Sequence, residues 1–211
     1  MIKVYFSSYS KKLSNSEFSE YLRLLPPELT QRIMRFQKWE NQHASLYGKL
    51  LLMKALKDAG SDTDLRHLKY TTYGRPYIEN APDFNISHSG FFAVCALSLQ
   101  GKIGVDIEEI KPASIHDFKE EFSAEEWNSI ANAANSTYWF YYYWTAKEAV
   151  IKADGAGLSL PLKKINIKDN KTIIDKTCWF IKNITINNNY MLQIATNKAI
   201  GTDIKLLEMF F

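Results

Sequence analysis

The chain has 211 residues, of which 46% are hydrophobic and 23% are charged, with a formal net charge of +3. This is an ordinary globular composition, and the length suits one large domain or two small ones. The charge is too small for a dedicated nucleic-acid binder but fits an acidic ligand or protein partner. No stretch reaches the roughly 18 apolar residues of a membrane span, and the N-terminus is too short in apolar residues for a signal peptide. We expect neither nucleic-acid nor membrane binding.

The first half of the chain mixes helical and strand patterns. Residues 2–7 are expected to form a strand, and residues 16–59 to form helices with a break at Pro26-Pro27. A turn is expected at Gly74-Arg75-Pro76. The apolar run 91–98 is typical of a buried strand.

The second half repeats this mixture. In residues 103–108, Ile103, Val105 and Ile107 should face the core, and Asp106 and Glu108 the other side. Further elements are expected in chain order: a capping box at Ser123 and Glu126, a long helix over about 136–153, and strands beyond 163 around an Asn-rich turn at 187–189. The sequence thus predicts an α+β protein, and any joint between two halves should lie near Gly101.

The two cysteines, Cys95 and Cys178, lie in apolar surroundings. Two buried free thiols are the simplest interpretation, because a disulfide requires an oxidising compartment and nothing points to one. We therefore expect a cytoplasmic protein.

Three clusters could carry chemistry, and the first is the strand pair Asp106 and Glu108. Two residues apart on a strand, these carboxylates project side by side and repel each other unless a cation lies between them. Mg²⁺ prefers such oxygen ligands. On spacing alone, a solvated acidic strand edge is favoured over a metal site.

The second cluster lies on the long helix. One face is predicted to be core, and it holds Trp139, Tyr142, Tyr143, Ala146, Ala149, Val150 and Ala153. The opposite face carries Trp144, Glu148 and Lys152, with Lys147 at its flank. This face either is solvated with a routine Glu148–Lys152 pair or lines a cleft, where it could supply a metal ligand and bind phosphates.

The third cluster is FNISHSG, residues 84–90, preceded by the Gly-Arg-Pro turn. Ser87, His88 and Ser89 offer small polar groups that suit a phosphate, although a His between serines also stabilises local turns. A Ser-His hydrolase is disfavoured, because sequence neighbours rarely reach nucleophile–base geometry and no G-x-S-x-G elbow is present.

In combination and order, these stretches resemble the Sfp-type phosphopantetheinyl transferases. The matching stretches are YGRPYI, FNISHSG, IGVDIEEIKP, FSAEEW and WTAKEAVIKADGAGLSLPL, and RIMRFQKWENQHASLYGKLLL matches more loosely. The G-x-D-I-E element followed by W-x-x-K-E-x-x-x-K is highly specific as a pair. The resemblance implies two similar α+β halves related by a pseudo-twofold, residues 1–101 and 102–211, with coenzyme A in the cleft between them.

The resemblance also implies an activity and its partners. The 4′-phosphopantetheine group of coenzyme A would pass to a serine of an acidic apo carrier protein, of acyl, peptidyl or polyketide type. The cofactor would be Mg²⁺, the other product 3′,5′-ADP, and the protein a monomer. The carrier would dock near residues 110–125, with Lys111 and Phe118 as candidate contacts.

Site residues follow by position from the same resemblance. Asp106, Glu108 and Glu148 match the metal-binding acids. The residues that would contact coenzyme A are Arg75, Pro76, Ser87, His88, Lys147 and Lys152, with Arg32 and Arg35 as candidates for the 3′-phosphate. Ala44 occupies a position that is often basic. Glu148 would be the general base, Lys147 would assist the leaving phosphate, and Glu126 is an outside candidate for the base.

Two other functions remain open on the sequence. A catalytically inactive relative could hold coenzyme A or a carrier, although the presence of all three acids and both lysines argues against it. A metal-dependent phosphodiester hydrolase or nuclease could use the same carboxylates. Its fit to the Gly-Arg-Pro and Ser-His-Ser elements, and to the modest charge, is poorer.

Overall fold

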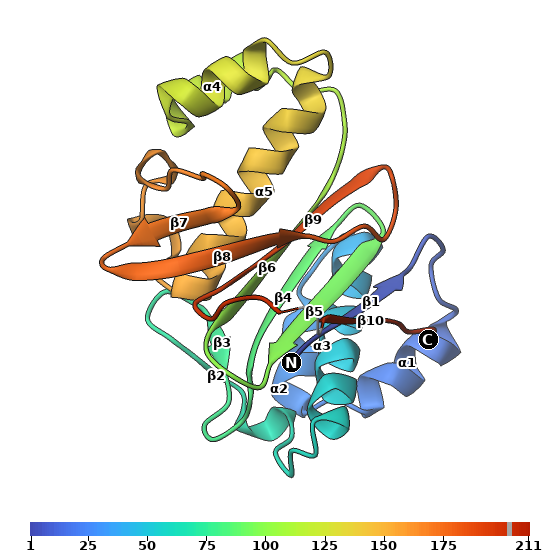
Figure 1. The fold of residues 1–211 in the computed structure, drawn as a ribbon. Coiled ribbons are helices and arrows are strands. Elements are labelled where there is room, and N and C mark those ends of the chain that lie inside the picture. Colours follow the sequence, from blue (N-terminus) through green and yellow to red (C-terminus); the bar gives the residue numbers. More distant parts are fainter. Residues whose placement is uncertain (202–203) are drawn as a thin grey trace.

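The computed structural model describes residues 1–201 and 204–211. Two four-stranded sheets, each covered by one long helix, form its two halves (Figure 1). The strand order is β10-β1-β5-β4 in the first sheet and β6-β9-β8-β7 in the second, and β2 pairs with β3 separately. This architecture confirms the predicted α+β class with two similar halves.

The strands are β1 (Ile2–Ser8), β2 (Lys69–Tyr70), β3 (Pro76–Tyr77), β4 (Asp83–Ser89), β5 (Phe92–Ser98), β6 (Ile103–Glu109), β7 (Lys171–Ile174), β8 (Thr177–Asn183), β9 (Tyr190–Thr196) and β10 (Ile204–Glu208). The α-helices are α1 (Asn15–Arg23), α2 (Pro27–Met34), α3 (Trp39–Asp58), α4 (Ala124–Ala131) and α5 (Ser136–Asp154). Short 3-10 helices are η1 (Leu65–His67), η2 (Ile115–Glu121), η3 (Gly157–Ser159) and η4 (Leu162–Lys164).

The predicted helical stretch 16–59 forms three helices. A capping box of Ser14 and Glu17 starts α1, and Pro27 starts α2, where a missing N–H costs nothing. The break at Pro26-Pro27 is therefore confirmed. A second break, at residues 35–38 before α3, was not predicted, because no Pro or Gly marks it.

The two sheets pack face to face, with the long helices outside. The core between the sheets includes Val4, Val94, Ile103, Val105 and Ile107, all fully buried. The last three confirm the predicted inward face of β6. Since burying such a side chain contributes about 1.5–3 kcal/mol, this core is a main link between the halves.

α5 lies directly on β6 because Gly104 has no side chain. A Cβ at Gly104 would lie 2.0 Å from the carbonyl oxygen of Ala149 and 2.4 Å from the nitrogen of Ala153. These distances are far inside van der Waals contact, so only glycine allows the approach. The approach brings Glu148 and Lys152, which flank these alanines, toward the polar side of β6.

The predicted apolar face of α5 is only partly correct. Ala149, Val150 and Ala153 are buried, but Tyr142 is half-buried and Trp139 is 39% exposed. The reason is that the N-terminal part of α5 projects beyond the second sheet toward α4 (Figure 1), so no sheet covers that end of the face.

The last strand crosses back to the first sheet. β10 runs parallel to β1, from Ile2 opposite Ile204 to Phe6 opposite Glu208. The division into 1–101 and 102–211 therefore stays a prediction, and its C-terminal part contributes one strand to the other half.

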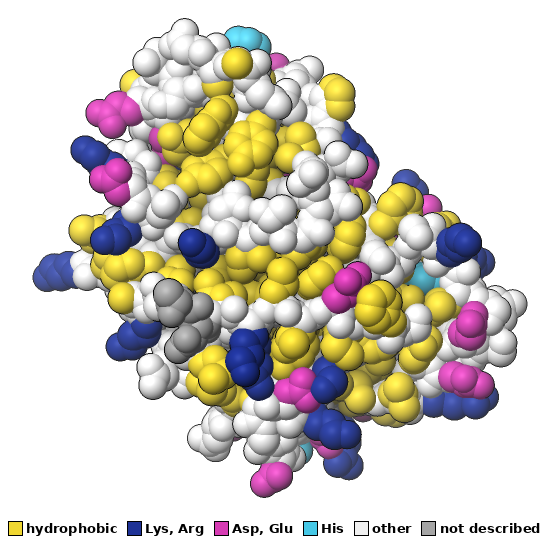
Figure 2. Space-filling model, turned by 45° about the vertical axis from the view of Figure 1, so that its right-hand side comes forward, with side chains coloured by type: hydrophobic (Ala, Val, Ile, Leu, Met, Phe, Trp, Pro, Cys, Tyr) yellow, Lys and Arg dark blue, Asp and Glu magenta, His cyan; other side chains and the backbone are white. Residues whose placement is uncertain are grey.

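Three further observations concern the chain as a whole. Cys95 is buried, whereas Cys178 is only half-buried, and both thiols are free. Within the described residues, no helix combines the length and apolar character needed to cross a membrane. On the face shown in Figure 2, basic and acidic side chains are interspersed and form no dense stripe of one sign.

Candidate active site

β4 and β6 lie side by side and are joined by side chains instead of a backbone ladder. Alternate residues of β4 accept hydrogen bonds from alternate N–H groups of β6, always 20 positions further along the chain. The bonds run from Ile103 N to Asp83 Oδ2 (2.7 Å), Val105 N to Asn85 Oδ1 (3.0 Å), Ile107 N to Ser87 Oγ (3.4 Å) and Glu109 N to Ser89 Oγ (3.1 Å). They satisfy edge-strand N–H groups that would otherwise lack a partner, and so fix how the halves are aligned.

This side-chain ladder brings the two β6 carboxylates against the serines of β4. Ser87 Oγ donates to Asp106 Oδ1 (3.1 Å), and Ser89 Oγ donates to Glu108 Oε2 (2.8 Å). From α5, Lys152 Nζ lies 2.5 Å from Asp106 Oδ1 and 3.0 Å from Ser87 Oγ. Asp106 is only 2% exposed. Residues from β4, β6 and α5 therefore meet at one point, and the solvated-edge alternative does not apply to Asp106.

The pKa values of Glu108 and Glu148 are both raised, by burial first and then by neighbouring negative charge. Burial raises the pKa of Glu108, and Asp106 and Glu148 raise it further, while the Ser89 hydrogen bond and Lys152 lower it. Burial and Asp106 also raise the pKa of Glu148, against the effect of Lys152. The three acids thus interact across the interface between β6 and α5, and an added cation would stabilise their ionised forms.

The fit of a divalent metal can be tested on the donor atoms. Asp106 Oδ2 is buried and has no hydrogen-bond partner among the described residues, which is costly for a carboxylate oxygen. Among those same residues, no three acidic, histidine or cysteine side chains are close enough to hold one ion. The predicted acids therefore do not form a closed coordination shell here. The unpartnered oxygen of Asp106 and the raised pKa values of Glu108 and Glu148 nevertheless fit a hard cation such as Mg²⁺.

A cavity of about 300 Å³ opens beside this cluster. Its lining includes Tyr73, Pro76, Ile86, Glu148 and Lys152, from the β2–β3 hairpin, β4 and α5. It therefore spans both halves of the chain and presents a carboxylate, an ammonium group and apolar surface together.

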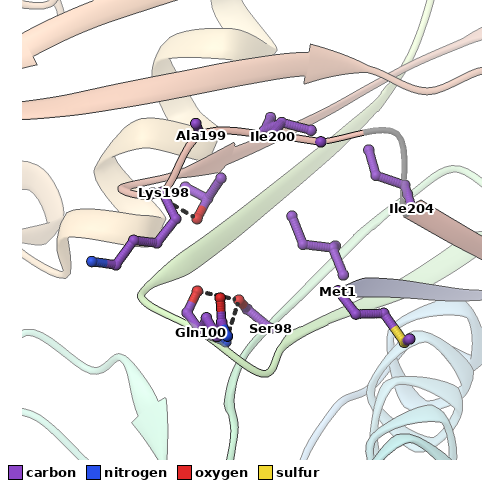
Figure 3. A pocket seen from close by; sticks show the side chains of 10 residues that line it. Met1, Ser98, Gln100, Lys198, Ala199, Ile200 and Ile204 are labelled. Carbon is purple, nitrogen blue, oxygen red and sulfur yellow. Dashed lines mark hydrogen bonds between the residues drawn. The ribbon is translucent and has the colours of Figure 1, made fainter.

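A second, smaller pocket of about 100 Å³ lies elsewhere, near the chain's first residue (Figure 3). Its lining includes Met1, Ser98, Gln100 and Ile204, and Ser98 Oγ donates to the carbonyl of Gln100. No carboxylate is among its described lining residues. Its one charged lining side chain among those described is Lys198, so it lacks the carboxylates that a metal site would need.

His88 points to the other side of β4 from Ser87 and is exposed. Although His88 is exposed, the neighbouring protein desolvates its ring in part and lowers its pKa, and the charges of Lys152 and Lys49 lower it further. Lys49, on α3, was not among the predicted site residues. A basic residue within the apolar stretch LYGKLLL could have suggested it.

The predicted N-terminal arginines are less well connected to this region. Arg32 lies over the ring of Tyr70, 4.6 Å from its centroid, and its charge reaches Lys49. Arg35 is exposed, and no contact of its side chain with the cluster is observed among the described residues. Their part in phosphate binding stays a prediction.

Lys147 does not join the cluster. Its side chain is fully buried, with Nζ 2.7 Å from Glu126 Oε2 and 3.1 Å from the carbonyl oxygens of Glu121 and Leu162. An ammonium has three N–H donors, so none remains for a phosphate in this arrangement. The flank of α5 predicted to face the cleft is therefore turned into the protein at this position. Glu126, the outside candidate for the base, is occupied by the same pair.

Arg75 lines the cavity but is also committed within the protein. Its side chain is 12% exposed and its guanidinium pairs with both oxygens of Asp83.

Trp144 lies on the polar face of α5 and packs against two aromatic residues. The centroid of its ring is 5.3 Å from that of Phe118 and 5.7 Å from that of Phe140.

Two sheets, each covered by a long helix, meet around Asp106, Glu148 and Lys152 beside a cavity. Comparison with known proteins shows the family to which a chain with this fold and site belongs. The model of the 4′-phosphopantetheinyl transferase superfamily matches residues 102–195, and that of the 4′-phosphopantetheinyl transferase N-terminal region matches residues 12–100.

Individual relatives agree with this match. The 4′-phosphopantetheinyl transferase Sfp of Bacillus subtilis is 34% identical over 79% of this chain and 76% of its own. The L-aminoadipate-semialdehyde dehydrogenase-phosphopantetheinyl transferase of Xenopus laevis is 30% identical over 88% of this chain and 72% of its own. The chain belongs to the 4′-phosphopantetheinyl transferase superfamily and is an enzyme of the transferase class.

Proposed function

We propose that the cavity at the junction of the halves binds coenzyme A, whose 4′-phosphopantetheine group passes to a serine of an apo carrier protein. The observation that carries this assignment is the meeting of Lys152 and Asp106, from different elements, beside a cavity that both halves line. Such a cavity can accept a pyrophosphate at the charged end and the adenosine along Tyr73 and Pro76.

Asp106, Glu108 and Glu148 are the proposed ligands of Mg²⁺. The support is the unpartnered oxygen of Asp106 and the raised pKa values of the two glutamates. When bound, the cation stabilises the charge of the pyrophosphate as a Lewis acid. Rotation of the Glu108 and Glu148 side chains would have to complete the coordination, because the described residues contain no ready cluster.

The reaction needs one nucleophile and one leaving group. The carrier serine oxygen attacks the β-phosphorus, the bond from that phosphorus to the oxygen of 3′,5′-ADP breaks, and the serine proton goes to Glu148, directly or through a water. Most of the catalysis is positioning and charge stabilisation, as is general for phosphoryl transfer.

Lys152 is the proposed phosphate-binding lysine. Its ammonium uses two donors on Ser87 and Asp106, which leaves a third for a phosphate oxygen. Lys147 instead holds α5 in place through Glu126, so its proposed role is to position Glu148 rather than to touch the leaving phosphate.

The carrier is proposed to dock along residues 110–125. A groove of about 550 Å³ there is lined by Phe122 and Trp127 together with Lys119, Lys163 and Glu120. Glu120 pairs with Lys163, and the apolar surface with the remaining basic group suits an acidic amphipathic partner. Phe118 is 38% exposed beside it, while Lys111 already pairs with Glu109 at 2.7 Å. We further propose that the protein acts as a monomer, since both halves of the site come from one chain, and that it works in the cytoplasm, where its two free thiols would stay reduced.

The test is to mix the protein with coenzyme A, Mg²⁺ and a panel of apo carriers, and to weigh the carriers by mass spectrometry. Addition of the phosphopantetheine mass to a carrier, with release of 3′,5′-ADP, is the expected result. Asp106→Ala should abolish it while circular dichroism stays unchanged. Binding of coenzyme A without product would support an inactive relative, and cleavage of nucleic acid without coenzyme A would support a nuclease.

A further inference from the structure

The Arg75 side chain makes four hydrogen bonds within the protein and so uses four of its five N–H donors. Its Nε donates to the carbonyl of Lys152 (2.8 Å), and one terminal nitrogen donates to the carbonyl of Ile103 (2.9 Å). The two terminal nitrogens also form a bidentate pair with Asp83, at 3.0 and 2.7 Å. One side chain thus joins the β2–β3 hairpin, β4, the start of β6 and the end of α5.

The backbone around Arg75 holds it in this place. Thr71 accepts the Arg75 N–H on its Oγ1 (3.1 Å) and donates its own N–H to the Arg75 carbonyl (2.9 Å). Gly74 has a φ of +81°, which allows the tight turn, and Pro76 restricts the conformation of the residue before it. The hairpin therefore presents the guanidinium in a single direction.

The partners of Arg75 are groups that need a donor. The carbonyl of Lys152 is one of the last four of α5, which have no partner within the helix, and a cation there also interacts favourably with the helix dipole. Gly155 ends the helix with a φ of +89°, and a Cβ there would lie 3.1 Å from Arg75 Cδ. The end of α5 is thus shaped to receive the arginine.

Asp83 connects this clamp to the acid cluster. Its Oδ2 accepts from Ile103 N as well as from Arg75, and it is the first member of the side-chain ladder that continues through Asn85 and Ser87 to the carboxylates of β6. The Arg75 guanidinium binds both Asp83 and the end of α5. These two contacts would hold Lys152 of α5 at a fixed distance from Asp106 of β6.

We propose that Arg75 is a positioning residue: its guanidinium clamps α5 to β6 and so holds Lys152 opposite Asp106, and it does not bind coenzyme A through its charge. This rests on the proposed function for its catalytic consequence only. The distinction is testable because a lysine would keep the charge but could not make the forked set of bonds.

The decisive variant is Arg75→Lys. The proposal expects kcat for carrier loading to fall about tenfold or more, and the KM for coenzyme A to rise by a smaller factor through the displaced Lys152, because misplacement acts mainly on the transition state. Asp83→Asn should lower kcat in the same way, and the double variant should be no worse than the more severe single one. Lys69→Gln, which breaks an exposed pair on the same hairpin, is the matched control and should retain wild-type kinetics.

Hydrogen exchange supplies a readout that does not depend on activity. Arg75→Lys and Asp83→Asn should speed exchange of the Ile103 and Val105 amides, while amides of β1 keep their wild-type rates. If the wild-type protein loads no carrier, the proposed function is contradicted. The exchange rates of the Ile103 and Val105 amides would still test whether Arg75 clamps α5 to β6. Wild-type kcat in Arg75→Lys, a change in KM alone, or unchanged exchange at Ile103 would overturn the proposal. If Arg75→Lys does not fold, Asp83→Asn decides in the same terms.

Discussion

Glu126 and Lys147 form an ion pair with 2.7 Å between carboxylate oxygen and ammonium nitrogen, and both side chains are closed off from solvent. Glu126 also accepts from the N–H of Ile167 and caps α4 through Ser123, and Lys147 lies 5.1 Å from the centre of the Phe122 ring. The pair therefore ties α4, η4 and α5 together one residue before Glu148. Even with this partner, burial lowers the pKa of Lys147.

Removing one member of this pair should destabilise the protein strongly. Lys147→Met leaves the Glu126 charge buried and uncompensated, at a cost of about 3–5 kcal/mol in the free energy of unfolding. Lys147→Met with Glu126→Gln should recover a large part of that loss. Urea denaturation measures both, with Lys69→Met as a control that breaks an exposed pair and should cost far less. A Lys147→Met loss no larger than the control would contradict the role given to this pair.

A side chain at Gly104 should separate α5 from β6. Since the added Cβ would meet backbone atoms at 2.0 and 2.4 Å, Gly104→Ala must shift the helix, and we expect a loss of about 3 kcal/mol together with most carrier loading. Gly201→Ala is the control, because a Cβ there meets no described atom within 4 Å. Thermal unfolding and the loading assay are the two measurements. A variant with unchanged melting temperature and full activity would show that the contact is not required.

The sequence predicted the elements well where periodicity was strong. The inward face of β6, the helix around residues 136–153 and the capping box at Ser123 follow from alternation, helical spacing and side-chain chemistry, and all three are observed. The second break in the N-terminal helices was missed, because neither Pro nor Gly marks the end of α2 near Arg35.

The site was harder to predict because sequence spacing does not say what a side chain meets across the fold. Lys147 and Lys152 were both predicted to bind phosphate. Lys147 is instead turned into the protein by its ion pair with Glu126 of α4, which the sequence does not reveal. Arg75 was predicted to contact coenzyme A; it does line the cavity, but its pairing with Asp83 could not be read from the sequence. Polar side chains alternate along β4, at Asp83, Asn85, Ser87 and Ser89, and this alternation indicates a strand with one polar face. It does not indicate that β6 is the strand to which these side chains bind.

His43 should make stability fall as the pH is lowered. Its buried ring accepts the Leu13 N–H on Nε2 (3.0 Å) and donates from Nδ1 to the Trp39 carbonyl (2.8 Å), so the neutral form is bound. Burial lowers its pKa, which means that the unfolded chain takes up the proton more readily. The free energy of unfolding should therefore fall as pH drops through the unfolded value of about 6.5 and level off below the folded one.

Urea titrations between about pH 7.5 and 5.5 measure this dependence. His43→Gln should flatten the curve relative to wild type, whereas His67→Gln, at an exposed position, should reproduce the wild-type slope. Equal slopes in wild type and His43→Gln would show that another group accounts for the pH dependence.

Asn85 tests whether the ladder between β4 and β6 contributes to stability. The Asn85 side chain is 4% exposed and its Oδ1 is the acceptor for Val105 N, so Asn85→Ala leaves a buried N–H without a partner. The expected loss is about 1–3 kcal/mol in the free energy of unfolding, measured in urea, with faster exchange of the Val105 amide. Asn128→Ala, which removes an amide on the surface of α4, is the control and should change stability by less than about 0.5 kcal/mol. Because the ladder aligns the carboxylates of β6 with α5, Asn85→Ala should also lower the rate of carrier loading. A variant that loses neither stability nor Val105 protection would mean that the face-to-face core between the sheets, and not the ladder, sets the alignment of the two halves.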